Sequence, residues 1–190
     1  MELDLNVQEG SIGTRIDQVK SVYLFMSLEG EISKDNEVRI KELANDLKLS
    51  ISEFPSIVRA CENIIGLSFD NDDRFDTILE HLVKFGKEKS ESEKVQILWL
   101  LVNCAFYDGE YNQNKKRFLR KLSRLWEIEN NVVILSEMED TAETLLDLEK
   151  HKEWIKTTNY PYDYTHSVVE ELDKNKQELA NNISLLVSIG

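Results

Sequence analysis

The sequence predicts an all-α protein, a helical bundle of about seven to eight helices. The 190 residues include only 7 Gly and 2 Pro, which is few for the tight turns of a β-sandwich or barrel. Apolar residues recur at three- and four-residue steps along most of the chain, as they do on the buried face of a helix. Residues that cap helices (Ser, Thr, Asn) or end them (Gly) stand between these segments.

Four helices are predicted in the first half of the chain, after a flexible leader at residues 1–10. Thr14, with Asp17 three residues later, is expected to cap the first helix, and Ser33 the second. Apolar residues recur at helical spacing in each segment, and glycines follow the first and the third. The predicted segments are 14–29, 33–47, 52–65 and 75–83, with Ser56 as an alternative start of the third.

Four further helices are predicted in the second half. Ser90 and Glu93 form a capping box for a fifth helix, VQILWLLVNCAFY. This helix is apolar nearly all round, which predicts the buried centre of the bundle. The others run from Asn112 to Trp126, from Asn131 to Trp154, and from Thr165 onward. Because Pro161 interrupts the pattern, we expect a main helical domain at 11–158 and a C-terminal helical extension at 159–190.

The net charge of −13 restricts the partners that the chain can bind. An acidic surface repels nucleic acids and anionic membranes, because a protein needs clustered Lys and Arg to bind either of them. Basic proteins or cations are the natural partners, although the acidity can also serve only to keep the protein soluble.

Three further features favour a cytoplasmic protein. The N-terminal stretch MELDLNVQEG lacks the basic and apolar regions of a signal peptide. No apolar run approaches the roughly 18–20 residues that span a bilayer, so direct membrane insertion is not expected. Cys61 and Cys104 both stand in apolar stretches, which predicts two reduced core thiols.

One pattern repeats within the chain at an offset of 79 residues. Glu-Gly-Glu at 29–31 recurs as Asp-Gly-Glu at 108–110 (108 − 29 = 79). Each copy predicts an apolar helix, an acidic-Gly-Glu turn and an amphipathic helix, and hence two helical hairpins related by pseudo-symmetry. The same offset pairs Ser33 with Asn112, Ile40 with Leu119, Leu43 with Leu122, Leu47 with Trp126, and Leu49 with Ile128.

The two turns resemble those of a known family. The stretches SLEGEISKDNE and AFYDGEYNQNK are similar to the turn of TerB-like (tellurite-resistance) domains, Ala-Asp-Gly-Glu-Ile-Ser followed by an acidic residue. The surrounding predicted helices stand in the order expected for that family, from about residue 11 to residue 155. The resemblance implies a TerB-like bundle over most of the chain.

The resemblance also implies a divalent-cation site, because the acidic turn residues of that family are thought to gather such an ion. Ca²⁺ or Mg²⁺ would suit carboxylate ligands, and a shared site requires both turns at one end of the bundle. An acidic-Gly pair is also an ordinary helix exit, so a metal-free turn is the alternative. The family's later acidic residue is replaced by Asn36 in one copy and Lys115 in the other. The candidate ligands are Glu29, Glu31, Asp108 and Glu110.

No pattern in the sequence predicts an enzyme. The chain has no nucleophile-elbow glycines, phosphate-binding loop or dinucleotide fingerprint. His81, His151 and His166 lack the spacing of zinc ligands and are expected at the surface. The tryptophans stand on predicted helices and are expected to be buried or half-buried; they are Trp99, Trp126 and Trp154.

The last predicted helix carries one apolar stripe at alternating three- and four-residue steps, which Lys176 interrupts. The upstream core looks complete, and Pro161 frees the direction of the helix. We therefore expect this stripe to bind a protein partner or a second copy of the chain. Its residues are Val169, Leu172, Leu179, Ile183 and Leu186.

Two functions remain open at this point. The resemblance implies a cytoplasmic, non-enzymatic module of a bacterial stress-response, tellurite-resistance or defence system, which binds a divalent cation and protein partners. The alternative is a metal-free, acidic helical module for protein–protein interaction. Calorimetric titration with Ca²⁺, Mg²⁺ and Zn²⁺ separates the two.

Overall fold

A computed structural model describes residues 12–50, 52–68, 70–109, 111–158 and 162–189, and these form eight α-helices. This confirms the predicted all-α class and the expected number of helices. None of the described helices combines the length and the hydropathy needed to cross a bilayer. The helices are α1 (Ile12–Met26), α2 (Lys34–Asp46), α3 (Phe54–Ile65), α4 (Asn71–Gly86), α5 (Glu91–Tyr107), α6 (Gln113–Leu125), α7 (Asn131–Thr157) and α8 (Tyr162–Ile189).

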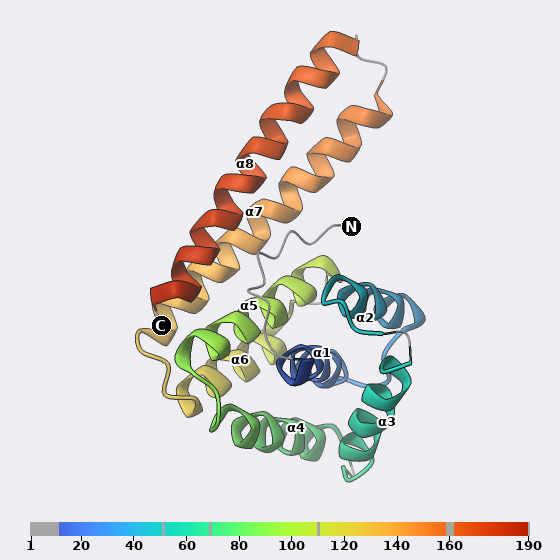
Figure 1. The fold of residues 1–190 in the computed structure, drawn as a ribbon, viewed down its shortest axis with the longest axis vertical. Coiled ribbons are helices and arrows are strands. Elements are labelled where there is room, and N and C mark those ends of the chain that lie inside the picture. Colours follow the sequence, from blue (N-terminus) through green and yellow to red (C-terminus); the bar gives the residue numbers. More distant parts are fainter. Residues whose placement is uncertain (1–11, 51, 69, 110, 159–161, 190) are drawn as a thin grey trace.

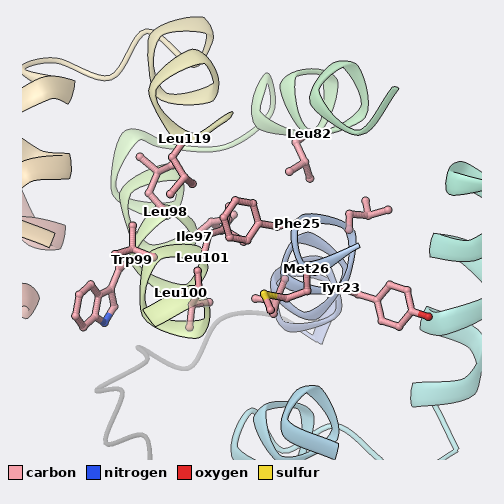
Figure 2. Packing of buried hydrophobic residues seen from close by; sticks show 14 of the residues in the cluster. Tyr23, Phe25, Met26, Leu82, Ile97, Leu98, Trp99, Leu100, Leu101 and Leu119 are labelled. Carbon is pink, nitrogen blue, oxygen red and sulfur yellow. The ribbon is translucent and has the colours of Figure 1, made fainter. Parts of the chain in front are cut away.

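Helices α1 and α5 form the centre of the bundle. Helix α1 packs against α2, α3, α4 and α5, while α5 also packs against α6, α7 and α8. Phe25 and Leu101 are fully buried, and Figure 2 shows Phe25 reaching from α1 toward α5. The apolar sequence of α5 therefore predicted its central place correctly.

A capping side chain explains where α2, α4, α5 and α6 begin. The Ser33 hydroxyl accepts a hydrogen bond from the backbone N–H of Asn36 at 3.2 Å, and Ser90 and Glu93 form the predicted capping box. Because α1 already begins at Ile12, Thr14 lies inside it and does not cap it. Helix α4 also begins earlier than predicted, because the Asp70 side chain caps it.

The repeat appears in the structure with matched boundaries. Helices α2 and α6 each have 13 residues, and both ends of α6 follow those of α2 by 79 positions (113 − 34 and 125 − 46). The residues after the two C-caps, Lys48 and Glu127, adopt left-handed conformations with φ of 55° and 56°. In each copy the next residue donates a backbone hydrogen bond into the last turn, Leu49 to Ala44 and Ile128 to Ser123.

Helices α7 and α8 form a long antiparallel hairpin that projects from the body of the bundle (Figure 1). The end of α8 returns along α7 to contact α5. Ion pairs join the two arms, with Lys152 paired to Asp173 and Lys176 Nζ 2.6 Å from Glu149 Oε1. The lysine that interrupts the apolar stripe of α8 therefore binds its own neighbouring helix.

Candidate functional site

The acidic turns of the two repeats meet at one junction. The Asn112 side-chain Nδ2 donates to both carboxylate oxygens of Glu29, at 2.9 and 2.7 Å. Asn112 also caps α6, because its Oδ1 accepts from the backbone N–H groups of Asn114 and Lys115. One side chain thus starts the second helix of the second repeat and holds the turn of the first.

A second contact crosses the junction in the opposite direction. Arg39, on α2 of the first repeat, donates from Nη1 to Asp108 Oδ1 at 2.9 Å and to the Tyr107 carbonyl at 2.8 Å. The Asp108 side chain is only 5% exposed, whereas that of Arg39 is 47% exposed. The guanidinium therefore compensates a carboxylate that is almost withdrawn from water.

The junction brings together some of the predicted metal ligands. Glu29 and Asp108 lie there with protein partners, Glu31 is exposed, and Glu110 lies outside the described residues. Among the residues that the structure describes, no group of three or more Asp, Glu, His or Cys side chains is placed to hold a metal ion.

The sequence marks Asn112 as a helix cap, whereas nothing in it marks Arg39 as part of the junction. Arg39 stands on the exposed side of α2, and its counterpart at the offset of 79 is Phe118. No repeated pattern marks it, and an arginine on an amphipathic helix is most often a solvated surface residue. Only the packing of the first repeat against the second reveals its role.

A cavity of about 180 Å³ adjoins the junction, between α1, α2 and α5. Arg39 and Asp108 form part of its lining, and Cys104 also lines it. Burial, followed by the charge of Asp108, raises the pKa of the Cys104 thiol to about 12. The thiol therefore stays protonated near neutral pH and is a poor nucleophile.

The structure also places the second cysteine and the three histidines. Cys61 is buried and free, and burial raises its pKa to about 12, which agrees with a core thiol. His151 and His166 are exposed, whereas His81 is half-buried against expectation. Burial, and then the charges of Lys20 and Lys84, lower the pKa of His81.

The predicted partner-binding stripe on α8 turns inward over part of its length. Ile183 is 4% exposed and belongs to the hydrophobic core, and Leu179 packs against that core. The expectation that this stripe faces another chain is therefore wrong for Ile183, because α8 runs back to α5 and completes its core. Val169 and Leu172 are half-buried, while the side chain of Leu186 lies outside the described residues.

Large apolar side chains remain exposed at other positions of the hairpin, and two of them lie near the predicted stripe or at the end of α7. Trp154 on α7 is 53% exposed and Leu185 on α8 is 61% exposed. Trp154 thus departs from the expected packing role, whereas Trp99 and Trp126 are buried.

Comparison of the chain with family models, with curated proteins and with solved structures finds no match.

Proposed function

We propose that the chain is a non-enzymatic, metal-free interaction module in which the paired acidic turns join the two repeats. The observation that carries this proposal is the Arg39–Asp108 ion pair, with Nη1 2.9 Å from Oδ1. The positive charge that a cation would supply at the junction comes from the protein itself.

The coordination that a metal needs supports the same proposal. Ca²⁺ takes about 6–8 oxygen ligands. A positive charge beside the site repels the ion and weakens its binding. Both carboxylate oxygens of Glu29 already accept hydrogen bonds from Asn112. An ion bound by both Glu29 and Asp108 would compete with the Asn112 amide and would lie beside the Arg39 guanidinium, which already pairs with Asp108.

The projecting α7–α8 hairpin is the part of the molecule that we assign to partner binding (Figure 1). Trp154 is exposed on its α7 arm, and tryptophan is enriched among the residues that dominate binding energies at interfaces. The net charge of −13 favours a basic protein as the partner. The resemblance of the turns to TerB-like domains supports a cytoplasmic role in a bacterial stress-response or defence system.

Photo-crosslinking tests this assignment. A photoreactive amino acid at position 154, in cells that naturally produce the protein, should capture one protein reproducibly. The same probe at Val133, which is 60% exposed on the first turn of α7, is the matched control. Equal capture from both positions, or capture from neither, would contradict the role of Trp154.

A second candidate function is the cation-binding module that the family resemblance implies. The observation in its favour is that Glu29 and Asp108, one from each repeat, lie at the same junction. Calorimetric titration with Ca²⁺, Mg²⁺ and Zn²⁺ decides between the two candidates. A metal-free module gives no saturable heat, whereas a cation module gives heat that the paired changes Glu31→Gln and Glu110→Gln abolish.

A further inference from the structure

The cavity beside the junction has the size of a small-molecule site. Its volume is about 180 Å³, and an apolar protein cavity of about 150 Å³ is large enough to bind benzene. Val22, Met26, Ile40 and Leu43 supply apolar walls. The space therefore suits a single substituted ring or an aliphatic group of similar volume.

One polar side chain in the wall has an unmet hydrogen-bonding capacity. Asn103 lines the cavity and is 4% exposed, and its Oδ1 is buried without a hydrogen-bond partner among the described residues. Leaving such an acceptor unpaired destabilises a folded protein. A ligand that donates a hydrogen bond would remove this penalty.

The first repeat has an apolar residue at the position that corresponds to Asn103. The counterpart of Asn103 at the offset of 79 is Leu24, which is fully buried in the first repeat. The buried position thus holds a leucine in one copy and an asparagine in the other. The asparagine is a departure from the repeat, and it stands where the cavity lies.

The charges around the cavity restrict the ligand further. Its lining includes one cation, Arg39, and three carboxylates, those of Glu42, Asp46 and Asp108. The local excess of negative charge disfavours phosphates and carboxylic acids. Neutral molecules meet no such repulsion, and unlike cations they lose little hydration energy against the apolar walls.

We propose that this cavity binds a neutral small molecule with an apolar ring or chain and one hydroxyl or N–H group that donates to Asn103 Oδ1. This binding site lies beyond the proposed interaction function and does not depend on it. The module would then recognise a small ligand at the junction of its repeats and a protein through its hairpin.

Titration with three matched probes tests the proposal on the full chain. The probes are 4-methylphenol, which donates a hydrogen bond, 4-methylanisole, which only accepts one, and toluene, which does neither. Chemical-shift changes in ¹H–¹⁵N spectra should concentrate at the residues that line the cavity. We expect 4-methylphenol to bind about 3- to 10-fold more tightly than toluene, as one net hydrogen bond allows, and 4-methylanisole to show no such gain.

Two substitutions show whether Asn103 causes the preference. Asn103→Leu should bind both 4-methylphenol and toluene with similar affinity, and its retained toluene binding shows that the cavity is intact. If leucine crowds the cavity, Asn103→Ala serves the same purpose. The control is Gln18→Leu, because Gln18 is 1% exposed and its Oε1 is also unpaired among the described residues, but it does not line the cavity.

The proposal requires the 4-methylphenol preference in the wild type and in Gln18→Leu, and its loss in the Asn103 variants. Equal binding of the three probes by the wild type would overturn it, as would the absence of saturable shifts at the cavity. A preference that survives Asn103→Leu would overturn the role of Asn103.

Discussion

At the scale of single residues, Trp126 ties the second repeat to α4. Its indole Nε1 donates to the Leu82 carbonyl at 2.9 Å, and a Cβ atom built on Gly86 would lie only 2.1 Å from the same nitrogen. Gly86 is thus required by close approach of the indole ring. A glycine at the end of a predicted helix looks like an ordinary helix ending, so the sequence could not reveal this contact.

The substitution Gly86→Ala tests this fit. We expect it to lower the free energy of unfolding by about 1–3 kcal/mol, because the added methyl group forces the buried indole to move. Urea denaturation measures the loss. In a Trp126→Leu background, where leucine is the residue that the first repeat has at position 47, the same change should cost much less. Equal losses in both backgrounds would show that Trp126 is not the cause.

The raised pKa values of the two thiols predict that the protein loses stability at alkaline pH. Burial raises the pKa of Cys61 and of Cys104 from 9.0 to about 12, so the folded state retains protons that the unfolded chain releases. This stability is fully present below pH 9 and is lost as the pH rises from there toward 12. At pH 10 the loss is about 1 kcal/mol for each thiol.

Urea denaturation at pH 8 and at pH 10 checks this prediction. The wild type should lose stability between the two pH values. Burial also raises the pKa of Tyr23 and Tyr107, which adds a decline of the same sign. The double variant Cys61→Ala, Cys104→Ala should therefore decline less steeply than the wild type, and an unchanged decline would exclude the thiols as a cause.

At the scale of elements, the repeat is the feature that the sequence predicted best. Matched caps and apolar positions at the offset of 79 were enough to align α2 with α6 residue for residue. The exits of these helices were not predictable, because Lys48 and Glu127 stand in a left-handed conformation that usually favours Gly or Asn. The junction was predicted only in part: Asn112 has a visible capping role, whereas Arg39 becomes important only through contacts between the repeats.

The two caps allow a matched test of the junction. Ser33→Ala removes only a helix cap, whereas Asn112→Ala removes a cap and the hydrogen bonds to Glu29. We expect Ser33→Ala to lower the free energy of unfolding by about 1 kcal/mol, and Asn112→Ala to lower it by about 1 kcal/mol more than that. Asn112→Ser keeps a capping hydroxyl but cannot reach Glu29. Its free energy of unfolding should therefore lie between that of the wild type and that of Asn112→Ala.

Urea denaturation of the three variants measures these differences. A Glu29→Gln variant adds a control, because its neutral amide weakens the contact with Asn112 and leaves both caps in place. If Asn112→Ala and Ser33→Ala cost the same, the contact with Glu29 contributes nothing to the stability of the junction.

At the scale of the whole molecule, the direction of α8 was the feature that the sequence did not determine. An apolar stripe shows that one face of a helix is buried, but it does not show which surface covers that face. In the structure α8 runs antiparallel to α7 and packs against both α7 and α5 (Figure 1). The core that looked complete upstream includes Ile183 from the last helix.

This arrangement predicts a large loss of stability at one residue of α8 and almost none at a residue two positions further along. Ile183→Ser should lower the free energy of unfolding by about 2–4 kcal/mol, because it opens space in the core and places a hydroxyl there. Leu185→Ser should change it by less than about 0.5 kcal/mol, because Leu185 is 61% exposed. Thermal unfolding measures both effects, and light scattering measures the mass of each variant. A core role requires that Ile183→Ser melt at a lower temperature while its mass stays that of the wild type. A fall in mass with an unchanged melting temperature would instead show that Ile183 lies between two chains, and the hairpin would then be an assembly interface.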